Sequence, residues 1–172
     1  MRHHFSQITI VGTGFIGGSI GLAAKAAGLA DVVIGTDLEN KAIDQALAVR
    51  AIDRGHTDLV RAIKGSSLVI LASPVETFEE IIRSTVPVLE RETILSDVGS
   101  VKGQLVMNID GLLPPHLYFV GAHPIAGSEK PSAASSRADL FNEKPCILTP
   151  TAMTNTDAIN VIRSFWASIG ST

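Results

Sequence analysis

Residues 6–17 read SQITIVGTGFIG, and the architecture of the chain can be worked out from them. Residues 6–11 form a short β-branched run that predicts a buried strand, and the Ala- and Leu-rich segment after the glycines predicts a helix. Between them lies the spacing G-x-G-x-x-G, formed by Gly12, Thr13, Gly14, Phe15, Ile16 and Gly17. Such a strand–turn–helix unit is typical of a dinucleotide site, because glycine permits the tight turn and lets backbone approach a pyrophosphate.

An acidic residue stands where such a site requires one. Asp37 ends a second predicted strand, residues 31–36, and follows Gly17 by 20 positions. Its carboxylate would accept hydrogen bonds from the adenosine ribose hydroxyls and would repel a 2′-phosphate. Because no Arg follows Asp37 closely, we expect NAD rather than NADP. FAD is disfavoured because the rest of the chain is too short for a typical flavoprotein. The alternative is a glycine-rich structural turn in a domain that binds no nucleotide.

Strands and helices alternate along the rest of the chain. Further strands are predicted at 67–72, 93–96, 117–120 and 146–148, and helices at 15–28, 39–50, 77–90, 100–113 and 157–169. Residues 128–142 predict only a loop with a short helix. The alternation predicts an α/β fold, a doubly wound, mainly parallel sheet of Rossmann type, with residues 1–172 as one domain. Ligands of such sheets bind beyond the carboxyl ends of the strands.

The composition limits the class of protein. Hydrophobic residues make up 45% of the 172 residues and charged residues 18%, as in a globular core. The net charge of −3, without a Lys/Arg run, does not support a nucleic-acid partner. The single cysteine, Cys146, excludes an internal disulfide and fits the cytoplasm, where we expect the protein. Residues 3–24 carry no charge, but their glycines argue against a signal peptide or a membrane-spanning helix.

Unusual residues follow three of the later predicted strands. Ala72, Ser73 and Pro74 follow the third, where backbone and the Ser73 hydroxyl could contact a nicotinamide ribose. Ser100 follows the next strand, where it could cap the following helix, aim its hydroxyl at a substrate or at the nicotinamide of the cofactor, or do both. His123 follows the strand after that and suits proton transfer during alcohol oxidation. An ordinary turn and a structural histidine are the alternatives.

Other chemistries find no support in the sequence. The histidines and Cys146 have no metal-ligand spacing, so we predict no metal site. Neither a G-x-S-x-G nucleophile elbow nor a phosphate-binding G-K-[ST] loop is present. A hydride-transferring oxidoreductase therefore remains the leading enzyme class.

Four segments together resemble the prephenate/arogenate dehydrogenase family of tyrosine biosynthesis. They are GTGFIGGSIGLA at 12–23, LASPVETF at 71–78, SDVGSVKG at 96–103 and GAHPIAGSE at 121–129. The resemblance covers nearly the whole chain from about residue 7, and the last two segments are its most specific part. It implies an NAD-dependent oxidative decarboxylation of prephenate to 4-hydroxyphenylpyruvate, with arogenate as the alternative substrate.

The resemblance also implies roles for individual residues. His123 matches the family histidine that hydrogen-bonds the ring hydroxyl and takes its proton, and Ser100 matches the serine that orients both. Ser128 and Glu129 match positions lining the substrate and nicotinamide end of the cleft. The family's cofactor contacts correspond to Gly12 through Gly17, Asp37 and Ser73–Pro74.

The family normally continues into a helical domain that builds a homodimer and supplies cations for the substrate carboxylates. This sequence ends at Thr172, so we expect chiefly the cofactor-binding domain, with Lys102 and Lys130 as the cations that we can place in the cleft. Two other interpretations stay open. One is a non-catalytic NAD-binding module, and the other is a small-acid reductase of the β-hydroxyacid or pyrroline-carboxylate type.

The last predicted helix carries several large apolar side chains. If a helical domain is absent, the face near Phe165, Trp166 and Ile169 could be exposed to solvent. A large exposed apolar patch usually marks an interaction surface or an aggregation liability.

Overall fold

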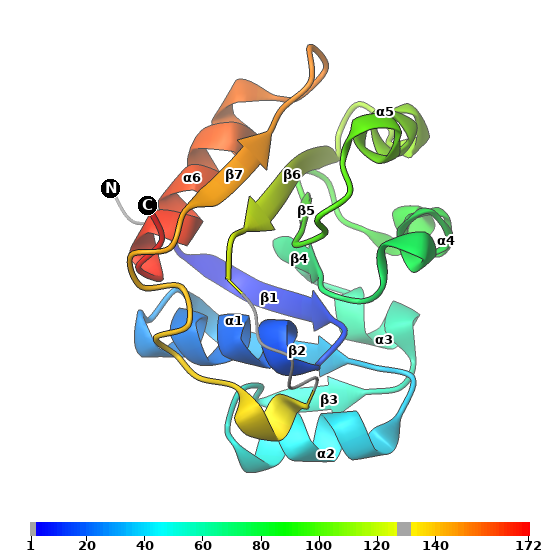
Figure 1. The fold of residues 1–172 in the computed structure, drawn as a ribbon. Coiled ribbons are helices and arrows are strands. Elements are labelled where there is room, and N and C mark those ends of the chain that lie inside the picture. Colours follow the sequence, from blue (N-terminus) through cyan, green and yellow to red (C-terminus); the bar gives the residue numbers. More distant parts are fainter. Residues whose placement is uncertain (1–2, 127–131) are drawn as a thin grey trace.

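The sheet is built as the sequence predicts. The computed structural model describes residues 3–126 and 132–172, and in them seven strands form one sheet in the order β3-β2-β1-β4-β5-β6-β7. All neighbours are parallel except β6 and β7, which are antiparallel (Figure 1). The strands are β1 (Phe5–Val11), β2 (Ala30–Thr36), β3 (Arg54–His56), β4 (Leu68–Leu71), β5 (Ile94–Asp97), β6 (Tyr118–Pro124) and β7 (Cys146–Thr149).

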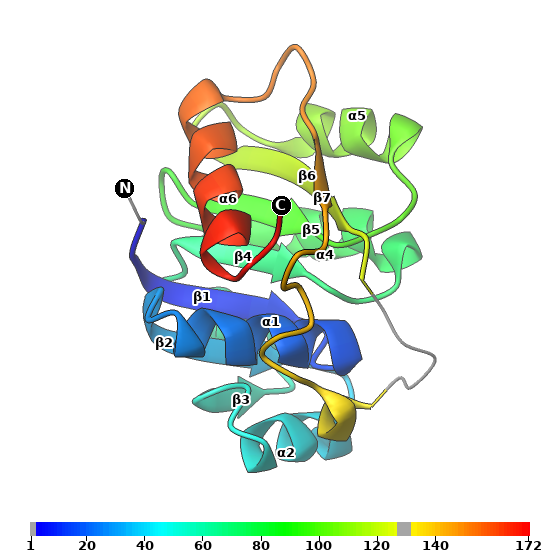
Figure 2. The same cartoon turned by 60° about the vertical axis from the view of Figure 1, so that its left-hand side comes forward.

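Helices cover both faces of this sheet, as Figures 1 and 2 show. The helices are α1 (Phe15–Ala26), α2 (Asn40–Ala48), α3 (Leu59–Ile63), α4 (Phe78–Thr85), α5 (Gly103–Leu112) and α6 (Thr156–Ser168). Buried side chains of α1, α2 and α6 belong to one hydrophobic cluster, and those of α3, α4 and α5 belong to the other. This confirms the doubly wound arrangement. Within the described residues, no helix has both the length and the apolar character needed to cross a bilayer.

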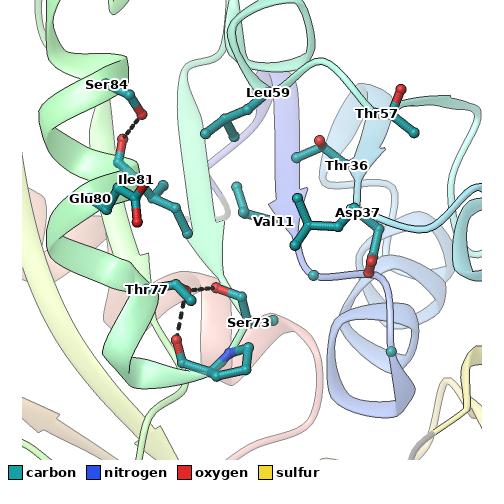
Figure 3. A pocket seen from close by; sticks show the side chains of 15 residues that line it. Val11, Thr36, Asp37, Thr57, Leu59, Ser73, Thr77, Glu80, Ile81 and Ser84 are labelled. Carbon is teal, nitrogen blue, oxygen red and sulfur yellow. Dashed lines mark hydrogen bonds between the residues drawn. The ribbon is translucent and has the colours of Figure 1, made fainter.

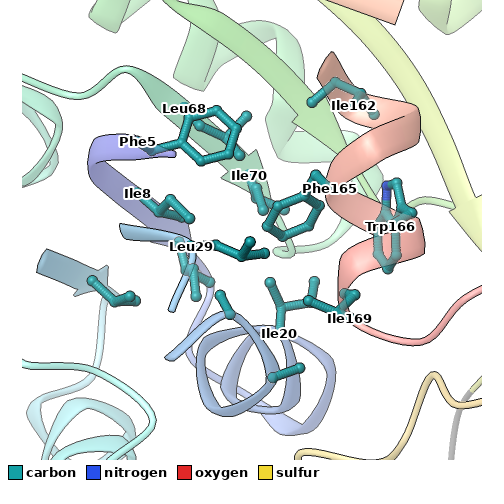
Figure 4. Packing of buried hydrophobic residues seen from close by; sticks show 14 of the residues in the cluster. Phe5, Ile8, Ile20, Leu29, Leu68, Ile70, Ile162, Phe165, Trp166 and Ile169 are labelled. Atoms are coloured by element: carbon teal, nitrogen blue, oxygen red, sulfur yellow. The ribbon is translucent and has the colours of Figure 1, made fainter. Parts of the chain in front are cut away.

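The apolar face of α6 is buried. Phe165, Trp166 and Ile169 are only 2%, 3% and 4% exposed, so the expectation that this face could be open is wrong. Phe165 packs edge-on against Phe5 of β1, with ring centroids 6.2 Å apart (Figure 4). Trp166 packs edge-on against Phe141, with ring centroids 5.3 Å apart. Phe141 lies in the segment between β6 and β7. Residues 128–142 are mostly polar, so the sequence does not indicate that Phe141 belongs to the core.

Three local features differ from the sequence prediction. Residues 51–66 hold β3 and α3, which were not predicted because both are too short to show a clear hydrophobic period. The helix expected at 77–90 ends at Thr85 and gives way to a 3₁₀ turn at Val86–Val88, which contains Pro87. The helix expected from Ser100 begins only at Gly103.

The strand order places the chain reversal at β1. The chain runs from β1 outward through β2 to β3, crosses back to β4 on the other side of β1, and then runs outward through β5 to β6. The connections that follow β1 and β4 therefore lead in opposite directions. The carboxyl ends of β1, β2, β4, β5 and β6 lie along one edge, because these strands are parallel. A crevice at this reversal is the usual ligand site of a doubly wound sheet.

Candidate functional site

The glycine turn after β1 is closed against the end of β4. Gly12 has φ +94°, and a Cβ placed on it would lie 2.6 Å from the amide nitrogen of Ser73. A Cβ on Gly17 would overlap the carbonyl oxygen of Gly12. Any side chain at either position therefore collides with backbone. The N-cap of α1 is Gly14, and no side chain caps this helix end, so amides of the first turn can bind an anion.

Asp37 is tied to this turn. Its Oδ2 accepts hydrogen bonds from the amide and the hydroxyl of Thr13, at 2.9 and 3.2 Å. Its Oδ1 accepts one longer bond, 3.3 Å, from the amide of Glu39. An ionised carboxylate offers about four acceptor positions, so Asp37 can still accept hydrogen bonds from ligand hydroxyls.

A cavity of about 510 Å³ opens between the glycine turn, the end of β2 and α4 (Figure 3). This volume is in the usual range for a small-molecule site. The cavity brings together six of the predicted cofactor residues, namely Gly12, Gly14, Asp37, Ala72, Ser73 and Pro74. Its other lining residues are Val11, Thr36, Leu38, Thr57, Leu59, Thr77, Glu80, Ile81 and Ser84.

The remaining predicted cofactor residues lie beside the cavity. Thr13 holds Asp37, while Phe15, Ile16 and Gly17 form the first turn of α1. Phe15 points into the interior with 7% exposure, and its carbonyl accepts hydrogen bonds from Ser19 and Ser136. Direct ligand contacts from these residues stay predictions.

The predicted catalytic residues lie farther along the same edge. His123 does not follow the strand as predicted, because β6 continues beyond residue 120 to Pro124 and includes His123, which is half-buried. Ser100 is exposed in the connection between β5 and α5. Neither lines the cavity beside Asp37. Ser100 does not cap α5, whose N-cap position is Lys102, so that expectation is wrong. Ser128 and Glu129 lie outside the described residues.

An ion pair at the end of β5 explains the late start of α5. Asp97 is buried, and its Oδ2 accepts hydrogen bonds from the amide of Gly99 and the ammonium of Lys102. Both bonds hold the segment between them in a non-helical path. Burial raises the pKa of Asp97 and lowers that of Lys102, while the attraction between the two charges opposes both shifts.

A family model described as prephenate dehydrogenase, nucleotide-binding domain, matches residues 20–172. The chain belongs to the prephenate dehydrogenase family. The glycine turn lies before residue 20, outside the matched range. Its interpretation as a nucleotide site therefore depends on its close contact with β4 and its hydrogen bonds to Asp37.

Individual relatives agree with the family. The chain is 35% identical to a cyclohexadienyl dehydrogenase of Zymomonas mobilis, covering 96% of this chain and 56% of that protein. It is also 35% identical to a prephenate dehydrogenase of Bacillus subtilis, covering 95% of this chain and 44% of that protein. A solved prephenate dehydrogenase from Aquifex aeolicus, in complex with hydroxyphenyl propionate and NAD+, superposes with a TM-score of 0.91 at 34% identity, covering 100% of this chain and 58% of that one. The chain thus spans about half the length of the curated relatives.

Several residues of the candidate site are not predicted from the sequence. Thr57 and Leu59 line the cavity from the unpredicted stretch around β3 and α3. The buried contacts of Asp97 were also missed. A signal was present, because a charged residue directly after an apolar strand must find buried partners.

Cys146, the single cysteine of the sequence, is expected to resist thiol reagents. Burial raises the pKa of the Cys146 thiol to about 12. Its thiolate fraction at pH 8 is therefore about a thousandfold smaller than that of an unfolded cysteine, whose pKa is about 8.5. Ellman's reagent should label the native chain slowly and the chain in denaturant at once. Equal labelling rates would contradict the raised pKa of the half-buried Cys146.

Proposed function

We propose that this chain binds NAD in the cavity beside Asp37 and forms the cofactor half of an NAD-dependent prephenate dehydrogenase. The observation that carries the proposal is the glycine turn, closed against Ser73 and joined to Asp37 through Thr13. The turn excludes side chains where a pyrophosphate would approach, and the carboxylate stands where ribose hydroxyls would bind. The family membership supports the same conclusion.

The residues present fit a dinucleotide. The uncapped amides of α1 would bind the pyrophosphate, with the helix dipole favouring its charge. Asp37 would hold the adenosine ribose and disfavour the 2′-phosphate of NADP. Leu38, Leu59 and Ile81 supply apolar surface in the cavity for a purine ring. The Ser73 hydroxyl shares a hydrogen bond of 2.8 Å with Thr77, which fixes its position at the end of β4.

Oxidation of prephenate needs a group that accepts the proton of the ring hydroxyl. When bound, NAD supplies the hydride acceptor for C4 of the substrate ring. His123 takes the proton of the ring hydroxyl, and Ser100 orients the histidine and the hydroxyl. Loss of CO₂ then produces an aromatic ring, which makes the overall step favourable. The protein's main task is therefore to position the substrate.

The wider setting is also a proposal. We place the protein in the cytoplasm, because its single cysteine is free and a biosynthetic dehydrogenase is expected in that compartment. A homodimer is the expected assembly of the longer form, as the family resemblance implies. Groups outside this chain would then supply further cations for the substrate carboxylates, because a dianionic ligand needs such partners.

The proposal is tested by calorimetric titration of the chain with NAD and with NADP. We expect NAD to bind at least about tenfold more tightly, and Asp37→Asn to weaken NAD binding while reducing this preference. Asp157→Asn is the matched control, since Asp157 lies in the first turn of α6 and does not line the cavity. Failure of both nucleotides to bind would overturn the proposal.

The second arm measures NADH formation with prephenate, and separately with arogenate. If the chain turns over, His123→Ala should lower kcat by about 100-fold or more without changing NAD affinity. NAD binding without turnover would assign the chain the cofactor half alone. Turnover that survives His123→Ala would contradict the role given to this histidine.

A further inference from the structure

The carboxylate of Asp97 makes more contacts than an ion pair requires. Its side chain is 1% exposed at the end of β5. Oδ1 accepts a hydrogen bond of 3.0 Å from the amide of Ala122, and Oδ2 accepts one of 2.9 Å from the amide of Gly99. The Lys102 ammonium also donates a hydrogen bond to Oδ2, and its positive charge balances the negative charge of the carboxylate. Asp97 therefore joins three segments of chain at one point.

This side chain continues the sheet where backbone pairing stops. The register between β5 and β6 runs from Ile94 opposite Tyr118 to Ser96 opposite Val120. Beyond that pair, the amide of Ala122 donates to the Asp97 carboxylate. The end of β6 is thus fixed to β5 by a side chain.

Each amide held by Asp97 immediately precedes a residue of the proposed active site. Ala122 precedes His123, and Gly99 precedes Ser100. Consecutive Cα atoms are a fixed 3.8 Å apart, so holding one amide places the next residue within a narrow range. The two oxygens of one carboxylate therefore tie the backbone before Ser100 to the backbone before His123, whose other edge pairs with β7 opposite Ile147.

We propose that Asp97 is a positioning residue, which holds Ser100 in register with His123 across the ends of β5 and β6. The inference rests on the proposed function, because it assigns Asp97 a role in placing those two side chains. Asp97 acts through the two backbone amides and does not touch the substrate. Lys102 makes the buried carboxylate tolerable by supplying the opposite charge.

The test compares Asp97→Asn with Ser66→Ala. An asparagine side chain has one acceptor oxygen and an NH₂ group, so it can accept from one of the two amides and must turn a donor toward the other. Ser66 is also buried, and its hydroxyl bonds Thr9 and Gln7 beside the amino end of β4. Ser66→Ala therefore removes buried hydrogen bonds far from Ser100 and His123.

In the NADH assay, Asp97→Asn should lower kcat by about 10- to 100-fold, with a smaller change in KM and NAD affinity within threefold of the parent chain. Ser66→Ala should lose stability while keeping kcat. The double variant Asp97→Asn/Ser100→Ala should be little slower than Ser100→Ala, because both changes disable the same unit. Equal kcat in Asp97→Asn and Ser66→Ala, or fully additive losses in the double variant, would overturn the proposal.

Nuclear magnetic resonance tests the proposal independently of turnover. The side-chain signals of Ser100 and His123 should shift in Asp97→Asn and stay in place in Ser66→Ala. If Asp97→Asn does not fold, Asp97→Asn/Lys102→Met removes both charges and takes its place. Unchanged signals for both residues overturn the positioning role even when NAD binds normally. Absent NAD binding by the parent chain overturns the proposed function instead, and the positioning role falls with it.

Discussion

Replacing Gly12 with alanine is expected to abolish NAD binding and to destabilise the chain by at least about 3 kcal/mol. The residue has φ +94°, where an L side chain is strained, and the new Cβ would lie 2.6 Å from the Ser73 nitrogen and 2.7 Å from the Ala72 carbonyl oxygen. These are backbone atoms and cannot rotate away. The glycine turn would have to move off β4, which distorts the cavity beside Asp37. Calorimetric titration and urea unfolding measure the two effects.

Gly28→Ala is the matched control for this substitution. Gly28 also has a positive φ, +62°, but nothing lies within 4 Å of a Cβ placed there. Its replacement should cost only about 1 kcal/mol through backbone strain and leave NAD affinity unchanged. If both alanine variants behaved alike, strain alone would explain the loss and the close approach to Ser73 would carry no importance.

Lys102→Met is the second substitution with a large expected effect. Removing the ammonium leaves the Asp97 carboxylate buried without its countercharge, which costs about 3–5 kcal/mol. Urea unfolding at pH 7 measures this loss. Lys25→Met is the control, because the side chains of Lys25 and Asp53 are 30% and 38% exposed, and breaking such a pair should cost below about 1 kcal/mol.

The loss in Lys102→Met should depend on pH. Burial already raises the pKa of Asp97 with Lys102 in place, and the variant loses the charge that opposes this rise. A carboxyl whose folded-state pKa is above its unfolded value is most favourable to folding below the unfolded value, about 3.9. Stability is then lost as pH rises through the folded-state pKa. The deficit relative to the parent chain should therefore shrink between pH 7 and pH 4, and a constant deficit would argue against a buried ionised Asp97.

The sequence predicts most of this fold because its signals are local. The apolar run before Gly12 and the alternation of strands and helices are sufficient to predict a doubly wound sheet, which the structure confirms. The short elements β3 and α3 are not predicted from the sequence, because segments of three and five residues are too short to show a hydrophobic period. Their position follows from pairing with β2, which is a tertiary interaction.

Part of the candidate site is likewise predicted from the sequence, and part of it is not. Gly12, Gly14 and Asp37 are predicted from spacing, and the structure brings them around one cavity. The cap expected from Ser100 failed because Asp97 holds Gly99 and Lys102, and no property of Ser100 itself reveals that competition. The burial of Trp166 also depends on a distant partner, Phe141. Sequence spacing predicts contacts along the chain, whereas contacts across the sheet need the assembled fold.

The pairing of Phe5 with Phe165 has a consequence for synthesis of the chain on the ribosome. Phe5 belongs to the first strand, and β1 takes a central place in the sheet with one face covered by α6 (Figure 4). Helix α1, which follows β1 directly, can pack against Ile10 early in synthesis. Phe5, in contrast, cannot meet Phe165 until residues near 165 have left the exit tunnel, because the chain emerges from its amino end. The Phe5 end of β1 therefore lacks its α6 partner for most of translation, and we expect chaperones that hold apolar segments to have their longest opportunity there.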